Sequence, residues 1–123
     1  MQPLFDVPYT DGDGVDSNAA RHHCFQVFSK DGQPHTDAST AGGQAEGCDV
    51  VFLLQAAFRG WSGPLTLTTF MARVAALGST YPLASGFSSH FSASQYDGAG
   101  AFRAMVFDSR CSCMKYAGSV TSL

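Results

Sequence analysis

The chain has 123 residues, a formal net charge of −3, 14% charged residues and 45% hydrophobic residues, ten of them phenylalanine. This length is typical of one compact domain, and the apolar fraction excludes wholesale disorder. Seven Lys plus Arg are too few for the basic surface of a nucleic-acid-binding protein, and they argue equally against anionic membrane surfaces. No apolar run approaches the roughly 20 residues that cross a bilayer, so we expect no direct membrane insertion.

The first third of the sequence predicts an irregular lead-in, a helix and a loop. Residues 1–16 contain two prolines and dense turn chemistry at 11–14, which exclude a helix there. A helix begins near Asp16 or Ser17, either of which is a good N-cap, and it ends at Gly32. Its expected apolar face consists of Ala20, Cys24, Val27 and Phe28.

Residues 31–43 are polar and rich in Gly, Ser, Thr and Asp, so they predict a loop. From about Gly43 to Arg59, helical spacing makes a wide apolar stripe that we expect to be covered on more than one side. The stripe contains Val50, Leu53, Leu54, Ala57 and Phe58.

The second predicted helix ends at Gly60, and residues 61–64 make a turn. Thr66 is the N-cap of a third helix, which Gly78 closes. A short Gly/Pro turn between two apolar stripes predicts that these helices form an antiparallel pair.

The last third has the character of strands. Residues 87–91 predict a weak strand, residues 95–98 a turn, and residues 101–108 a strand that alternates well. On this strand Phe102, Ala104 and Val106 face one way, and Arg103, Met105 and Phe107 face the other. Residues 113–116 predict one more short strand. With no internal repeat and no long linker, residues 1–123 form a single α/β unit of three helices and a short strand-rich tail.

Four cysteines in a lightly charged chain indicate an oxidising compartment, periplasmic or extracellular. They allow three pairings. Cys24 with Cys48 closes a loop of about 25 residues and stabilises by roughly 3 kcal/mol, whereas Cys111 with Cys113 closes a small ring whose rival is a free or redox-active pair. Pairing of Cys24 with Cys111 stays open. The N-terminal residues have no signal-peptide features, which favours a piece of a longer exported chain.

Metal sites receive little support from the sequence. His22 and His23 are adjacent on the predicted helix and point about 100° apart, so they do not aim at one ion together with Cys24, Cys111 and Cys113. Residues 11–16 resemble the opening of a calcium loop, but His22 stands where the closing glutamate belongs. We therefore expect solvent-facing histidines, disulfides and no metal.

Catalytic motifs are also missing from the sequence. There is no Gly-x-Ser-x-Gly elbow and no Cys/His signature, although serines and histidines are present. Glu46 is the single glutamate, so a glutamate pair for glycoside hydrolysis is unsupported. Gly42-Gly43 lacks the remaining glycine and the lysine of a phosphate-binding loop. We expect neither an enzyme nor a cofactor.

The order of several segments resembles the final part of type I periplasmic solute-binding proteins, the branched-chain amino-acid receptors of ABC importers. The likeness covers roughly residues 45–116. It rests on Cys48-Asp49 before an apolar helix, on Gly63-Pro64-Leu65-Thr66 before another with Phe70 and Leu77, and on the tail Gly86-Phe87, Phe91, Tyr96-Asp97-Gly98-Ala99, Phe102-Arg103 and Phe107-Asp108.

This resemblance implies the C-terminal segment of a two-lobed receptor that binds a small solute, such as an amino acid, and delivers it to the membrane subunits of an ABC transporter. It implies no ligand-binding residue here, because the family's ligand-holding loops precede the matched region. Residues 81–91 are similar to the family's last interlobe crossing and are the expected hinge. The apolar stripes of the second and third helices are then expected not to be fully covered by these 123 residues. The alternative function is a small secreted, disulfide-bearing interaction or structural protein with no role in transport.

Overall fold

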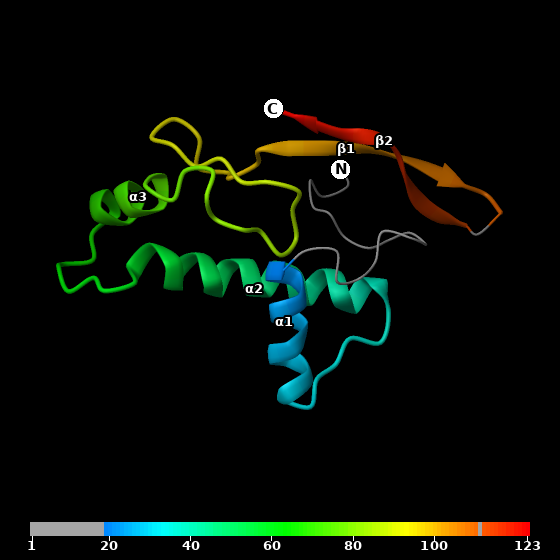
Figure 1. The fold of residues 1–123 in the computed structure, drawn as a ribbon, viewed down its shortest axis with the longest axis horizontal. Coiled ribbons are helices and arrows are strands. Elements are labelled where there is room, and N and C mark those ends of the chain that lie inside the picture. The colour runs from blue at the N-terminus through cyan, green and yellow to red at the C-terminus, as the bar shows by residue number, and fades with distance from the viewer. Residues whose placement is uncertain (1–18, 111) are drawn as a thin grey trace.

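The computed structural model describes residues 19–110 and 112–123, and shows three helices followed by an antiparallel hairpin (Figure 1). The predicted mixed α/β arrangement, with three helices before a strand-rich tail, is confirmed. The long helix α2 lies along the longest axis of the molecule, and α1 crosses it at a steep angle. The elements are α1 (Ala19–Lys30), α2 (Ala38–Phe58), α3 (Leu67–Ala75), β1 (Ala101–Asp108) and β2 (Cys113–Ser122).

Helix α1 ends as predicted, because Gly32 adopts a positive φ of 74° that terminates a helix without steric cost. Its buried face differs from the prediction: Arg21, Cys24 and Phe25 are buried, whereas Val27 is exposed. Three of the four predicted residues are confirmed, since Cys24 is in the buried cluster and Ala20 and Phe28 pack against it. The prediction missed Arg21, a charged residue that turns inward to donate to the main chain of Ala84. The predicted lead-in and the proposed N-caps at 16 and 17 lie outside the described residues.

Helix α2 begins five residues earlier than predicted, at Ala38 rather than Gly43. The carboxylate of Asp37 caps it by accepting from the main-chain N–H of Thr40 at 2.8 Å. Ala41 and Ala45, both fully buried, then pack in the cluster that includes Cys24 of α1. This packing offsets the low helix propensity of Gly42 and Gly43, which had suggested a loop.

The predicted pairing of α2 with α3 is confirmed and involves the C-terminal half of α2. Gly60 has a φ of 69° and ends α2, and Thr66 forms a reciprocal capping box with Thr69 at the start of α3. Ala57 of α2 and Val74 of α3 are buried in one cluster, surrounded by Phe52, Leu53, Phe58, Phe70 and Leu77. α1 and α3 therefore cover two sides of α2, and a third side, with Val50, Val51 and Leu54, is open.

The strand predicted over residues 87–91 is wrong. That segment makes one isolated bridge instead, Ser89 opposite Ala99, and a second bridge, Ser92 opposite Gln95, follows directly after it. The ladder does not extend because the N–H of Phe91 donates to the carbonyl of Gly78, at the end of the α3 region, at 2.9 Å. The predicted turn at 95–98 is displaced: the tight turn lies at 92–95, where Ser92 and Gln95 exchange main-chain hydrogen bonds, and residues 95–98 contain only a bend before Gly98, which has a φ of 70°.

The hairpin confirms the strand at 101–108 and lengthens the next strand beyond its predicted end at Tyr116. Phe102 pairs with Thr121 and Ala104 with Ala117, so β2 bulges opposite Arg103. Gly118 adopts a φ of 73° in this bulge, and its carbonyl accepts from Arg103 Nε at 2.9 Å. In the sequence, Gly118 reads as a turn residue that would end the strand. Pairing resumes beyond it, which explains why β2 is longer than predicted.

The predicted alternation of β1 is confirmed except at its end. Phe102, Ala104 and Val106 are exposed, and Arg103 and Met105 on the other face are half-buried. Phe107 belongs to the second face by spacing but is exposed as well. Over residues 19–110 and 112–123, no helix combines the length and hydropathy needed to cross a bilayer.

Candidate functional site

A disulfide joins Cys24 of α1 to Cys48 of α2, with the Cα atoms 5.9 Å apart. This is one of the pairings that the sequence left open. Both cysteines are buried, in a cluster with Phe25, Ala41 and Ala45. Burial shields the bond from solvent reductants, which is typical of a structural disulfide. Cys111 and the side chain of Cys113 lie outside the described structure.

Three histidines near the disulfide contact aromatic rings or a side-chain amide. His23 stacks on Phe52 with centroids 5.3 Å apart, and His35 lies 4.3 Å from Phe25. A nitrogen of His22 lies 2.8 Å from the side-chain amide of Gln26. Among the residues that the structure describes, no three His, Cys, Asp or Glu side chains gather as metal ligands. The calcium-loop pattern at 11–16 lies outside the described residues.

Asp49 and Arg21 anchor the chain after α3. The Asp49 carboxylate accepts from the main-chain N–H groups of Ala84, at 2.7 Å, and Ser85, at 2.9 Å, and from the Ser85 hydroxyl. The Arg21 guanidinium, fully buried, donates Nε–H to the carbonyl of Ala84 at 2.7 Å. Two charged side chains from different helices therefore fix one peptide segment, which we call the anchored segment (residues 81–85).

Tyr81 begins the anchored segment and is buried against Phe91. Its hydroxyl donates to the main-chain carbonyl of Asp49 at 3.2 Å. Burial, and secondarily the negative charge of Asp49, raise the pKa of this phenol well above its usual value. A neutral phenol that donates to a carbonyl is a structural contact, and it ties the predicted hinge region to α2.

Ser79 and His90 form a serine–histidine contact. Ser79 Oγ lies 2.9 Å from His90 Nδ1, and both side chains are exposed. Nucleophilic catalysis also needs an orienting acid. Asp97, which lies in the following turn, instead accepts from the main-chain N–H of Ala99. Within residues 19–110 and 112–123, no hydrogen bond joins His90 to a carboxylate, so this part of the chain supplies no third member of a catalytic triad.

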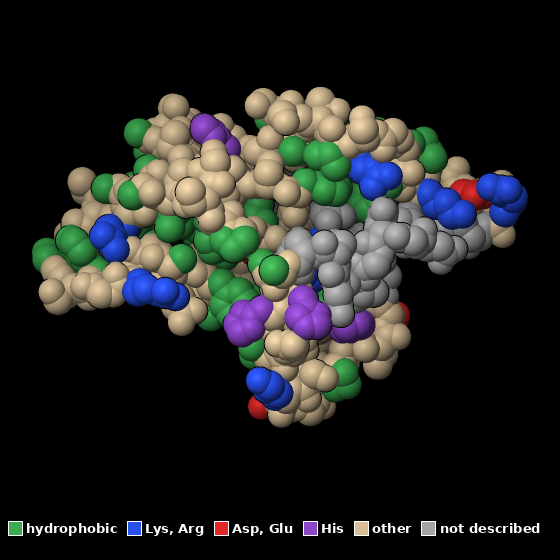
Figure 2. Space-filling view, in the orientation of Figure 1, with side chains coloured by type: hydrophobic (Ala, Val, Ile, Leu, Met, Phe, Trp, Pro, Cys, Tyr) green, Lys and Arg blue, Asp and Glu red, His purple; other side chains and the backbone are tan. Residues whose placement is uncertain are grey.

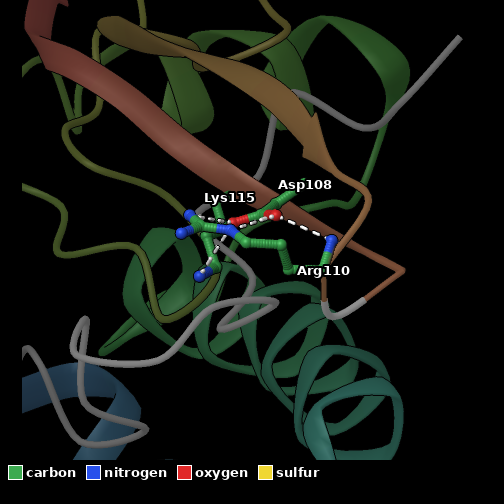
Figure 3. Close-up of polar contacts among 3 residues, drawn as sticks. All are labelled: Asp108, Arg110 and Lys115. Carbon is green, nitrogen blue, oxygen red and sulfur yellow. Dashed lines mark hydrogen bonds and ion pairs between the residues drawn. The ribbon is translucent and has the colours of Figure 1, made fainter.

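The tip of the hairpin carries an ion cluster (Figure 3). Asp108 accepts from the main-chain N–H of Arg110 and from its Nη2, both at 2.9 Å, and lies 3.2 Å from Lys115 Nζ. These bonds from Arg110, with a smaller contribution from Lys115, hold the pKa of the Asp108 carboxyl well below its usual range. Arg110 is exposed, whereas Asp108 and Lys115 are half-buried. Ion pairs at the surface contribute little to stability, so the cluster fixes the tip geometry more than it stabilises the fold.

Large apolar side chains are exposed at the turn between α2 and α3. Leu65 and Leu67 are 71% and 77% exposed, and Trp61 is also exposed. We call these three residues the turn surface. Figure 2 shows hydrophobic side chains at that end of the molecule. Trp61 is packed against α3, because the Arg73 guanidinium lies 5.3 Å from its ring centroid and donates to the Ala57 carbonyl.

Sequence reasoning identified Cys24 and Cys48 but missed the contacts around them. The anchoring role of Asp49 gave no local signal, since its partners lie 35 and 36 residues later. The Asp108-x-Arg110 spacing, by contrast, is a turn pattern that was available in the sequence.

Comparisons of this chain with protein-family models, with curated proteins and with solved structures find no match.

Proposed function

We propose that this chain is an extracytoplasmic interaction domain that binds another protein through its turn surface. The observation behind this proposal is the exposure of Trp61, Leu65 and Leu67 together on one short turn. Clustered apolar exposure of this kind is typical of protein–protein contact sites, and a tryptophan on a fixed backbone is a frequent binding anchor. The buried disulfide supports the proposed extracellular or periplasmic location.

The backbone of the turn is ordered by hydrogen bonds, which favours binding of a partner. Thr69 Oγ donates to the carbonyl of Pro64 at 3.0 Å, so the peptide before α3 is tied to the helix. Arg73 connects the same turn to the end of α2. Side chains presented on a pre-ordered backbone lose less conformational entropy on binding.

The test compares the wild-type chain with the double variant Leu65→Lys/Leu67→Lys. Both are immobilised and exposed to the extracellular or periplasmic proteins of the source cell, and retained proteins are identified by mass spectrometry. We expect at least one protein retained by the wild type and lost with the variant, because two buried charges are costly in an apolar interface. Thermal unfolding at unchanged midpoint verifies that the variant folds. Equal retention on both proteins refutes the proposal.

The solute-binding receptor is the second candidate, with a small solute and ABC-transporter membrane subunits as its partners. The specific observation in its favour is the open apolar side of α2, with Val50, Val51 and Leu54 exposed. In a two-lobed α/β receptor such a helix face covers a sheet. On this proposal the chain contributes the C-terminal part of that fold, and the anchored segment lies within the hinge.

A thermal-shift screen with amino acids, amides and small acids tests the receptor proposal, because a ligand at a hundred times its Kd stabilises by about 2.7 kcal/mol. Hydrogen exchange over residues 81–91 provides the second measurement. A hinge requires ligand-dependent exchange there, and the bonds to Asp49 must break or re-form. No shift with any solute, with unchanged exchange, contradicts the receptor proposal.

A further inference from the structure

The main chain of Ala84 is bonded at both of its polar groups by charged side chains from two different helices. Its N–H donates to the carboxylate of Asp49 on α2, and its carbonyl accepts from Nε of Arg21 on α1, each at 2.7 Å. Ala84 is fully buried, so water does not compete for either group. We call Arg21 and Asp49 the Ala84 clamp. Both bonds form only while α1 and α2 keep a spacing at which the two side chains reach one residue.

The Cys24–Cys48 disulfide lies beside the Ala84 clamp. On α1, Arg21 precedes Cys24 by three residues, so the two buried side chains are on one face of the helix. On α2, Asp49 directly follows Cys48. Ala84 belongs to the same buried cluster as the two cysteines. Figure 1 shows the chain after α3 passing the crossing of α1 and α2, where these bonds form.

The loop between the two helices is too far away to set their spacing at the clamp. It joins α1 at Lys30 to α2 at Ala38. Cys48 lies about 15 Å along α2 from Ala38, at the α-helical rise of 1.5 Å per residue. Because α1 crosses α2 at a steep angle, the two helices contact each other over a short stretch only (Figure 1).

The noncovalent contacts at this crossing tolerate small shifts that the clamp does not. They are the apolar packing of Phe25, Ala41 and Ala45 and the ring stack of His23 on Phe52. Apolar packing is not directional, whereas hydrogen bonds weaken steeply with distance and angle. The disulfide is therefore the constraint that holds α1 and α2 at the spacing that the clamp requires.

We propose that formation of the Cys24–Cys48 disulfide switches the anchored segment from a loose to a held state, so that residues 81–85 are fixed to α1 and α2 only after oxidation. In the reduced chain the two sulfur atoms are unbonded thiols in van der Waals contact, which moves the close-packed helices apart and opens the clamp. On oxidation the two thiols pass two protons and two electrons to a disulfide-bearing oxidant, which becomes a dithiol. The new S–S bond brings Arg21 and Asp49 within reach of Ala84.

Burial of the bond makes this switch directional. Cys24 and Cys48 are both buried, so reductants do not easily reach the disulfide once the chain has folded around it. Thiols stay reduced in reducing compartments and pair in oxidising ones. The anchored segment is therefore loose in a reducing compartment and stays held after oxidation. This inference goes beyond the proposed function, because it uses none of the residues of the turn surface.

Amide hydrogen exchange of the full chain is the first test. It compares the oxidised protein with the double variant Cys24→Ala/Cys48→Ala, which cannot form the bond. We expect exchange at Ala84 and Ser85 to accelerate by at least about tenfold more than exchange at Ala76, the C-cap of α3. Equal acceleration at all three amides overturns the proposal, because the loss is then global. Unchanged exchange at Ala84 and Ser85 overturns it as well.

Dithiothreitol separates the effect of this bond from that of any other thiol. Wild-type protein that is unfolded and refolded in the presence of this dithiol should exchange at Ala84 like the double variant. The double variant itself should show no further change when the dithiol is added. If its exchange at Ala84 still responds to the dithiol, the switch does not depend on the Cys24–Cys48 bond and the proposal is wrong.

A double-mutant cycle tests the link between the bond and the clamp. In the oxidised chain we expect Asp49→Asn to lower the folding equilibrium constant by about tenfold, and in the Cys24→Ala/Cys48→Ala chain by less than about threefold, because the clamp is already open there. Thr66→Ala is the matched control, since it removes the N-cap of α3 and should have the same effect in both chains. An equal effect of Asp49→Asn in both chains contradicts the proposed link.

Discussion

Removal of the Asp49 carboxylate tests whether this side chain holds the anchored segment in place. Asp49→Ala deletes three accepted hydrogen bonds, two from main-chain N–H groups and one from the Ser85 hydroxyl. Ser85 and Ala84 are buried, so water does not easily replace the lost acceptor at their N–H groups. The variant therefore leaves two buried donors without a partner that they have in the native protein.

The expected loss follows from the number and type of these bonds. A hydrogen bond to a charged group contributes about 1.5–3 kcal/mol, and an unsatisfied buried donor costs about 1–3 kcal/mol. Asp49 itself is only half-buried, which reduces each contribution. We expect Asp49→Ala to lower the free energy of unfolding by roughly 3 kcal/mol, a large share of the roughly 5–15 kcal/mol of a typical domain. Asp49→Asn keeps one carbonyl oxygen and should cost about half as much.

Urea denaturation measures this loss, with far-ultraviolet circular dichroism reporting the helices and the fluorescence of the single tryptophan reporting the α2–α3 turn. Amide hydrogen exchange at Ala84 and Ser85 adds a local readout, since protection there should fall more than the global change. Asp31→Asn, at an exposed position, is the matched control and should change stability by less than about 0.5 kcal/mol. If Asp49→Ala behaves like this control, or if both amides stay protected, the reasoning is refuted.

Three further outcomes are expected. Substitution of Cys24 and Cys48 with alanine removes the α1–α2 disulfide and its effect on loop-closure entropy, so the free energy of unfolding in urea denaturation should fall by about 3 kcal/mol. An unchanged midpoint contradicts this expectation. The raised pKa of Tyr81 means that the unfolded chain loses this proton first, near pH 10, so stability falls as pH rises above that value; Tyr81→Phe should show a shallower decline. The lowered pKa of Asp108 gives stability that is lost as pH falls through the folded-state value; carboxyl NMR titration should find its midpoint below that of a free aspartate, and Arg110→Gln should move it upward.

The sequence alone identified the segments whose local chemistry is self-sufficient. Thr66 and Gly60 mark helix ends because capping and a left-handed backbone depend on adjacent residues only. The strand at 101–108 follows from its alternation. The start of α2 and the irregular course of residues 87–91 were mispredicted, because Ala41 packs against α1 and Phe91 bonds to Gly78, and neither partner is a sequence neighbour.

The candidate surfaces divide in the same way. The sequence predicts a small α/β unit with disulfides from its length, composition and cysteine content. It offers Cys24 and Cys48 as one possible pair without choosing between the pairings. Only the tertiary structure decided that Arg21 turns inward, that Asp49 holds residues 84 and 85, and which side of α2 remains open. The physical reason is that periodicity predicts that a helix has an apolar side, whereas burial depends on which distant segments pack against it. In α2 apolar residues occur on nearly every side, so packing alone separates the core face from the exposed side with Val50, Val51 and Leu54.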